Sequence, residues 1–239
     1  REAKSCLAEA MAAGFQDLSI DFIYGTPTMD DEKWLYNLRT AFDFGIPHLS
    51  CYALTVEPKT ALQHLIVKGK AAGISEEQSA RQFEILLQEV AQHGYEQYEI
   101  SNFCRPPHYA QHNSSYWQGA HYLGLGPSAH SFNGSTRQWN IANNANYIKG
   151  IEANEPIFEL EYLSPQEQHN EYIMTALRTK WGLDLDYIHK RWGIEAGQLF
   201  QNKSKLFLQQ ELMIEEAQNF RLSDSGKLLA DTIISDLFW

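Results

Sequence analysis

The stretch Leu18-Ser19-Ile20-Asp21-Phe22-Ile23-Tyr24-Gly25-Thr26-Pro27 decides the fold of this chain. Its β-branched and aromatic residues predict a mostly buried strand over 18–24, ended by a turn at the glycine and proline. An alanine-rich helix over 1–14 precedes this strand, and a helix over 30–44 with one apolar face follows it. A second strand is expected over 49–56. Because the strands begin about 30 residues apart with one helix between them, we expect a parallel pair in an α/β layer.

The pattern changes further along the chain. Residues 59–73 look like a loop, and Ser75-Glu76-Glu77-Gln78 predicts a capping box that starts a helix ending at Gly94. A short strand is expected over 98–103. Residues 95–147 are rich in aromatic, histidine, asparagine and glycine residues, as loops that carry binding sites often are.

Ser164-Pro165 predicts the first helix of a C-terminal part. Further helices are expected over 184–191, 195–200 and 203–213, then a short strand over 220–223 and a last helix that ends at residue 239. This order has winged-helix character. We therefore divide the chain into residues 1–94, a connecting region over 95–160 and a mostly helical, winged-helix-like part over 161–239.

Composition limits the possible functions. The chain has 239 residues, of which 44% are hydrophobic, and a formal net charge of −11. This is enough apolar material for a sizeable core, while the acidic balance argues against nucleic-acid binding. We find no run near the ~18 apolar residues of a membrane span and no signal peptide at Arg1–Lys4, so we expect a cytoplasmic protein. Cys6, Cys51 and Cys104 are too far apart for a compact metal motif and are expected to be reduced thiols.

Asp21 is the first residue that could carry chemistry. A carboxylate in an apolar strand needs a partner, and ligands of parallel α/β folds gather at the carboxyl ends of the strands. Asp21 could accept a ribose hydroxyl or an adenine amine, with Gly25 allowing close approach of the backbone. A structural interior aspartate is the alternative. Ala53, at the matching end of the second strand, could line an adenine pocket or belong to the core.

The run His112-Asn113-Ser114-Ser115-Tyr116-Trp117 is the most distinctive one. An imidazole can ligate iron, and two aromatic rings could pack against a flat macrocycle. The alternative is an ordinary surface or core histidine. His108, His121 and His130 lie nearby but match no zinc spacing, and the choice between His108 and His112 as an iron contact stays open.

Four sequence motifs, taken together and in this order, are typical of one protein family. They are Asp21-Phe22-Ile23-Tyr24-Gly25-Thr26-Pro27, Gly94-Tyr95-Glu96-Gln97-Tyr98-Glu99-Ile100-Ser101-Asn102-Phe103, His112-Asn113-x-x-Tyr116-Trp117, and Tyr122-Leu123-Gly124-Leu125-Gly126-Pro127-Ser128-Ala129-His130-Ser131. Together they resemble the radical S-adenosylmethionine proteins related to oxygen-independent coproporphyrinogen III oxidase, in the heme-chaperone branch of that family. The resemblance extends over nearly the whole chain.

The resemblance implies an α/β fold made of the C-terminal portion of a partial (β/α)6 barrel, followed by a HemN-type C-terminal domain. It also implies a [4Fe-4S] cluster and S-adenosylmethionine at the barrel mouth. By position, Asp21, Ile23, Gly25 and Ala53 correspond to S-adenosylmethionine contacts. His112, Tyr116 and Trp117 correspond to heme contacts, with His112 on the iron. The run Ser101-Asn102-Phe103 replaces the Asp-His-Phe of the decarboxylating oxidases and favours the chaperone branch.

One feature of the family is missing. The sequence contains no C-x-x-x-C-x-x-C cluster motif. We therefore expect a C-terminal fragment of a longer protein, with no catalytic residues and no radical chemistry of its own. The exposed edge of the strand over 18–24 would then favour dimerisation, which light scattering showing a clean monomer would contradict.

Three functions remain open at this point. The first is a heme chaperone that passes heme to an unknown, membrane-associated acceptor by peripheral association. The second is an oxidase that decarboxylates the propionates of coproporphyrinogen. The third is a non-enzymatic winged-helix interaction module. Nucleic-acid binding by that module ranks last, because residues 161–239 hold 8 Lys and Arg against 12 Asp and Glu.

Overall fold

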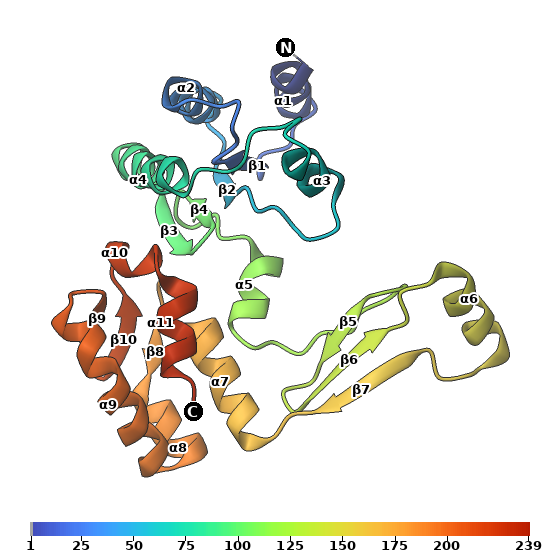
Figure 1. Ribbon diagram of the computed structural model, residues 1–239, viewed down its shortest axis with the longest axis vertical. Helices are drawn as coiled ribbons and strands as arrows, with labels where there is room; N and C mark the ends of the chain where they lie inside the picture. Colours follow the sequence, from blue (N-terminus) through green and yellow to red (C-terminus); the bar gives the residue numbers. More distant parts are fainter. Residues whose placement is uncertain (1) are drawn as a thin grey trace. The chain divides into compact units, whose positions relative to one another are not determined.

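The computed structural model describes residues 2–239, which form two compact units (Figure 1). The first unit ends at Ala110 and the second runs from Gln111 to Trp239. Arg1, which belongs to the predicted first helix, lies outside the described residues. None of the helices within 2–239 is both long and apolar enough to cross a membrane.

The first unit is a sheet with helices, in the order α1 (Glu2–Ala12), β1 (Ser19–Tyr24), α2 (Asp31–Asp43), β2 (His48–Ala53), α3 (Ala61–Val67), α4 (Glu76–Gln92), β3 (Glu96–Glu99) and β4 (Asn102–Cys104). The four strands lie in the order β1-β2-β4-β3. β1 and β2 are parallel, from Ser19 opposite His48 to Tyr24 opposite Ala53, which confirms the expected parallel pair. β4 runs antiparallel to both of its neighbours. β1 is therefore an edge strand in the part of the chain that the structure describes, and self-association through this edge stays a prediction.

Three sequence predictions in this unit are wrong. The single strand over 98–103 is a pair of short antiparallel strands, β3 and β4. The predicted loop over 59–73 contains α3, which starts where the Thr60 hydroxyl accepts a hydrogen bond from the Gln63 amide. β1 is not mostly buried, since exposed and partly buried residues alternate along it. A strand at the edge of a sheet, covered by helices on one face, has this alternation.

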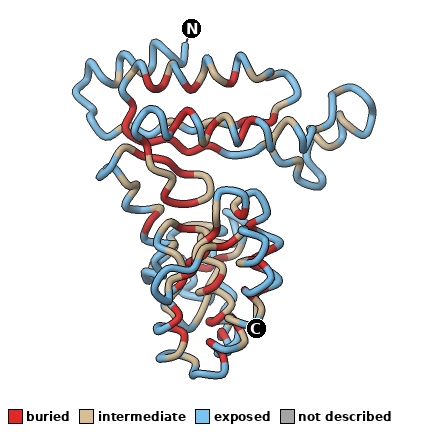
Figure 2. Tube along the Cα trace, turned by 90° about the vertical axis from the view of Figure 1, so that its left-hand side faces the viewer, coloured by how far each residue is buried: buried red, intermediate tan, exposed pale blue. Residues whose placement is uncertain are grey.

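Helices α2 and α4 cover one face of this sheet and form its core (Figure 1). Trp34 of α2 is fully buried, makes edge contact with Phe22 and donates its indole N–H to the Gln82 carbonyl of α4 at 2.9 Å. Buried positions follow the inner sides of the helices and the sheet (Figure 2). Apolar residues at helical spacing on both helices explain this packing, because each helix can bury one stripe against the sheet.

The second unit contains two three-stranded sheets. Its first part consists of α5 (Gln111–Trp117), β5 (His130–Phe132), β6 (Thr136–Asn140), α6 (Asn144–Ala153) and β7 (Phe158–Tyr162). Its second part consists of α7 (Pro165–Ala176), β8 (Leu183–Asp184), α8 (Leu185–Trp192), α9 (Ile194–Gln209), β9 (Met213–Glu216), β10 (Asn219–Leu222), α10 (Asp224–Lys227) and α11 (Ala230–Leu237). The sheets have the orders β5-β6-β7 and β8-β10-β9, with antiparallel pairs throughout.

The second part has the helix and strand order of a winged helix, as expected. Ser164 and Glu167 form a reciprocal capping box at the start of α7. The β9–β10 hairpin forms the wing, and Phe200 of α9 packs edge-on against Phe220 of this hairpin at 5.1 Å. The prediction of two helices, over 195–200 and 203–213, is wrong. The structure has one helix, α9, which ends at Gln209, and Met213 is already the first residue of β9.

We expect a buried histidine to make this part of the chain less stable in acid. His169 of α7 is 1% exposed and stands edge-on to the rings of Trp192 and Trp239. Burial lowers the pKa of His169 below its ordinary value. The unfolded chain therefore binds a proton more readily than the folded chain, so stability falls as the pH falls below about 6.5, the ordinary histidine value.

We expect His169→Phe to reduce this loss of stability in acid, because phenylalanine keeps the ring packing and does not titrate. Urea unfolding at about pH 7.5 and about pH 5 checks this, with the exposed His64→Phe as the control. An equal acid loss in His169→Phe and the parent chain would show that His169 does not contribute.

Candidate functional site

The sheet of the first unit has a polar face opposite α2 and α4. The alternation of β1 and β2 puts Asp21 and Ser50 on this side, opposite each other in the register. The following side chains make up what we call the polar sheet face: Ser19, Asp21, His48, Ser50, Tyr98, Glu99 and Asn102. A polar, partly open sheet face at the ends of two parallel strands can take a ligand with hydrogen-bonding groups.

A chain of hydrogen bonds crosses this face. The Ser19 hydroxyl lies 2.7 Å from His48 Nδ1, and His48 Nε2 lies 2.8 Å from the Tyr98 hydroxyl. Burial lowers the pKa of His48, and the charge of Asp21 opposes that shift. Next to it, the Asn102 amide donates to the buried Glu99 carboxylate. Sequence reasoning missed this network, although the alternation Ser19, Asp21 and His48, Ser50 was a readable signal.

The structure brings together two of the four predicted S-adenosylmethionine residues. Asp21 and Ile23 are both exposed on the same side of β1. The alternative prediction of an interior aspartate is wrong, because Asp21 is exposed in β1. Ala53 is exposed at the end of β2, but it lies on the same side of the sheet as Cys51, which is the side opposite Asp21 and Ile23. Gly25 follows β1 in the adjoining turn.

Gly25 is held by helix α4. Its N–H donates to Gln82 Oε1 at 2.8 Å, and the Gln82 amide donates to the Met29 carbonyl at 3.0 Å. Gly25 has a φ of 74°, and a Cβ at this position would lie 2.3 Å from the Ser79 hydroxyl. The absence of a side chain at Gly25 therefore lets the backbone of this turn lie close to α4.

The predicted capping box at the start of α4 is half formed. The Ser75 hydroxyl accepts from the Gln78 amide at 3.2 Å, as expected. The Gln78 side chain, however, donates to the carbonyls of Thr26 and Met29 at 3.1 and 2.6 Å. It fixes the loop after β1 in place of closing the box.

Helix α5 carries the three predicted heme residues. His112 and Tyr116 are exposed one turn apart, and the Tyr116 hydroxyl lies 3.2 Å from His112 Nε2. The two rings meet edge to face at 4.9 Å. Trp117 is half-buried and donates its indole N–H to Asn113 Oδ1 at 3.2 Å. The structure thus brings His112 and Tyr116 into contact and places Trp117 next to them in the helix.

The loop before β5 presents two leucines to solvent. Leu123 and Leu125 are 74% and 81% exposed. The backbone between them is fixed: the Gly124 N–H donates to the Ser131 hydroxyl at 3.0 Å, and the Asn140 amide donates to the carbonyls of Gly124 and Gly126 at 3.3 and 2.9 Å. The backbone approaches closely here, since a Cβ on Gly124 would lie 2.2 Å from the His130 carbonyl oxygen.

This region carries no fixed charge. Residues 106–136 contain no Asp, Glu, Lys or Arg, although 21% of the whole chain is charged. The stretch includes α5, the exposed leucines and four histidines. Within the second unit, residues 111–136 contain α5 and the exposed leucines, and a stretch of this composition favours an apolar or aromatic ligand over a highly charged one.

His108 belongs to the first unit and is a second candidate for binding iron. Its Nδ1 lies 2.8 Å from Asp17 Oδ1. Histidines that ligate metals commonly have the other ring nitrogen on a carboxylate in this way. The choice between His108 and His112 therefore stays open on geometry alone.

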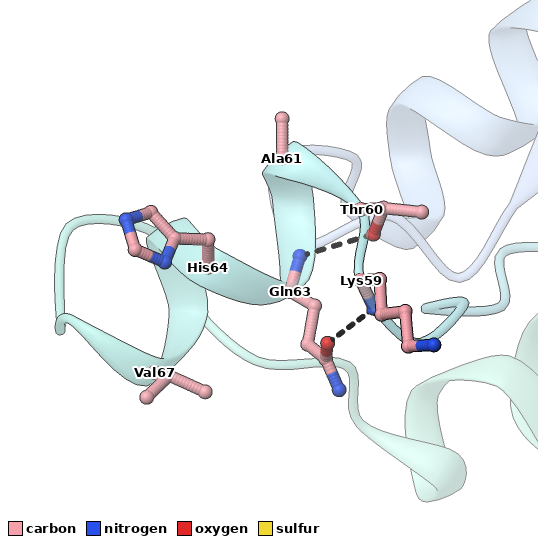
Figure 3. Close-up of a pocket in the computed structure, with 6 residues that line it drawn as sticks. All are labelled: Lys59, Thr60, Ala61, Gln63, His64 and Val67. Atoms are coloured by element: carbon pink, nitrogen blue, oxygen red, sulfur yellow. Dashed lines mark hydrogen bonds between the residues drawn. The ribbon is translucent and has the colours of Figure 1, made fainter.

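A shallow hollow of about 390 Å³ lies over α3 (Figure 3). Its lining residues are Lys59, Thr60, Ala61, Gln63, His64 and Val67. The Lys59 N–H donates to Gln63 Oε1 at 2.7 Å within this group. The hollow contains none of the predicted site residues.

The described residues do not fit an iron–sulfur cluster. Cys6 is exposed, while Cys51 and Cys104 are buried. Within residues 2–239, no three His, Cys, Asp or Glu side chains come together as a metal site. Burial also raises the pKa of the Cys51 thiol, which disfavours the thiolate that iron requires.

Comparisons with known proteins agree with the fold. The model of the HemN C-terminal domain matches residues 163–229. The solved structure described as "Coproporphyrinogen III oxidase (HemN) from Escherichia coli is a Radical SAM enzyme" matches 99% of this chain and 58% of that chain, with a TM-score of 0.78 and 18% identity. At this identity the match shows the fold. The fold class is thus that of the C-terminal portion of HemN.

The similar protein sequences are those of heme chaperones. The heme chaperone HemW of Mycobacterium tuberculosis is 31% identical over 236 residues, which are 98% of this chain and 58% of that protein. HemW of Bacillus subtilis is 31% identical over 94% of this chain and 59% of its own length. The chain is thus a homologue of the HemW heme chaperones, with a HemN C-terminal domain over residues 163–229 and the fold of HemN. It spans somewhat more than half the length of these relatives.

Proposed function

We propose that this chain handles heme, with the heme site on α5 of the second unit. In this proposal His112 contacts the iron, and Tyr116 and Trp117 pack against the macrocycle. The observation that carries the proposal is an exposed histidine with two neighbouring aromatic rings inside a stretch that lacks fixed charge. The relatives named heme chaperones support the same function.

The chemistry of the ligand fits these residues. Heme is a flat, largely apolar macrocycle whose iron accepts an imidazole nitrogen, so it needs one histidine and apolar contacts. Heme carries two propionates and coproporphyrinogen carries four, so coproporphyrinogen would call for more arginine or lysine partners. Residues 106–136 supply none of these cations. We therefore favour heme transfer over propionate decarboxylation.

We also propose that the polar sheet face contributes to an S-adenosylmethionine site. Asp21 could accept a hydrogen bond from the nucleoside there, and Ile23 could pack against it. Gly25 would fix the turn that follows β1. Ala53 lies on the other side of the sheet, so it would contact the ligand only where the ligand extends past the end of β2. The cluster that serves this ligand in a radical S-adenosylmethionine protein supplies the electron for its cleavage. The residues of this chain would bind and orient the nucleoside.

A titration with ferric heme tests the heme site. We expect saturable binding by the chain, and we expect His112→Ala to weaken it by at least about tenfold, since loss of an iron contact costs at least about 1.4 kcal/mol. Absorbance in the Soret region measures the binding. His64→Ala removes an exposed histidine from α3 and serves as the matched control.

His108→Ala separates the two candidates for the iron contact. If His108→Ala weakens binding and His112→Ala does not, the iron contact is His108, with Asp17 orienting its ring. If the chain binds heme with equal strength in all three variants, the proposed site on α5 is wrong.

A further inference from the structure

We propose that Tyr116 masks the iron-binding nitrogen of His112, so that heme binding must first displace the Tyr116 hydroxyl. This inference rests on the proposed heme function and goes beyond it by assigning Tyr116 a competing role. It makes Tyr116 a positioning residue that controls access to His112, in addition to an aromatic surface for the macrocycle.

The contact is specific to one nitrogen. The Tyr116 hydroxyl lies 3.2 Å from His112 Nε2, one helical turn away. Iron needs the lone pair of an imidazole nitrogen. A hydroxyl that donates to Nε2 occupies this lone pair, and a hydroxyl that accepts from Nε2–H requires the tautomer in which Nε2 has no free lone pair. In either case iron cannot bind Nε2 while the contact persists.

Neighbouring rings fix Tyr116 in the masking position. Its ring centroid lies 4.9 Å from that of His112 and 4.8 Å from that of Tyr122, and both pairs meet edge to face. Tyr122 is itself joined to Phe132 of β5 by two backbone hydrogen bonds, at 2.9 and 3.0 Å. The ring of Tyr116 is therefore supported from the β5 sheet, and displacing its hydroxyl disturbs a packed row of rings. A protein that must pass heme on benefits from a hydroxyl that competes with the iron for His112 Nε2, because return of the Tyr116 hydroxyl to Nε2 favours release of the heme.

The first test is the heme affinity of Tyr116→Phe. This variant keeps the ring contacts and removes the hydroxyl. We expect heme to bind about two- to tenfold more tightly, the factor that corresponds to the net value of one hydrogen bond. The Soret spectrum at saturation should match that of the parent chain, because the iron contact is unchanged. Tyr122→Phe is the matched control, since it removes a neighbouring hydroxyl that lies outside the contact with His112.

A second test needs no heme. Diethyl pyrocarbonate modifies accessible imidazole nitrogens, and peptide mass spectrometry reports the rate at His112 alone. We expect faster modification of His112 in Tyr116→Phe than in the parent chain or in Tyr122→Phe. Unchanged modification of His112 would overturn the masking role.

The two tests separate the inference from the function on which it rests. If His112→Ala binds heme normally, the proposed heme site fails, while faster modification in Tyr116→Phe still supports masking of the histidine. If Tyr116→Phe binds heme equally or more weakly while His112→Ala abolishes binding, the heme site stands and the masking role is wrong.

Discussion

Replacing Gln82 by leucine should destabilise the first unit by about 2–4 kcal/mol, although leucine fills nearly the same volume. The Gln82 side chain is fully buried. It accepts from the Gly25 N–H at 2.8 Å and donates to the Met29 carbonyl at 3.0 Å and to Asp31 Oδ1 at 3.2 Å. Leucine would leave the buried Gly25 N–H without this acceptor, and an unsatisfied buried group costs more than the bond itself was worth.

Urea unfolding of the whole chain measures this effect, and hydrogen exchange of the amides over 25–29 locates it. Gln88→Leu is the matched control, because Gln88 lies exposed on the same helix, α4. We expect the control to change stability by less than about 0.5 kcal/mol. Equal stability of Gln82→Leu and the parent chain would show that α4 does not fix the loop after β1.

The strands β1 and β2 show what the sequence could predict about the fold. Their apolar runs and the intervening helix predicted the parallel pairing, because hydrophobic spacing is a local property of the chain. The β3–β4 hairpin was not predictable in the same way. It contains a register shift between Gln97 and Glu99, so the alternation on which strand prediction depends is broken there. Helix α3 was missed because none of its residues is buried, which leaves no apolar stripe to recognise.

In the candidate site, too, local features could be predicted from the sequence and contacts between distant residues could not. The residue types at His112, Tyr116 and Trp117 suggested a heme contact, and a helical spacing of four residues puts His112 and Tyr116 on one face. The roles of Gln78 and Gln82 could not be predicted, because their partners lie about 50 residues away in sequence. Gly25 looked like a ligand-binding glycine for this reason, whereas its space is taken by Ser79 of α4.

The second large effect is expected at Gly226, in the HemN C-terminal domain. Gly226 has no left-handed φ, so its backbone conformation suits any residue. The space around Gly226, however, does not admit a larger side chain. A Cβ on Gly226 would lie 1.9 Å from the Leu212 carbonyl oxygen, which is backbone and cannot rotate away. That carbonyl also accepts from the Ser223 N–H at 3.0 Å, so moving it breaks the junction between α9 and the wing.

Gly226→Ala should therefore destabilise the second unit by about 2–4 kcal/mol, through overpacking and loss of this hydrogen bond. Gly119→Ala is an informative control, because Gly119 has a φ of 69° and a Cβ there would meet nothing within 4 Å. A left-handed position costs alanine about 1–2 kcal/mol, so the control should lose less stability than Gly226→Ala. Urea unfolding compares the two variants. A larger loss in Gly119→Ala would mean that backbone conformation outweighs close packing here, and that the wing can shift to admit a methyl group.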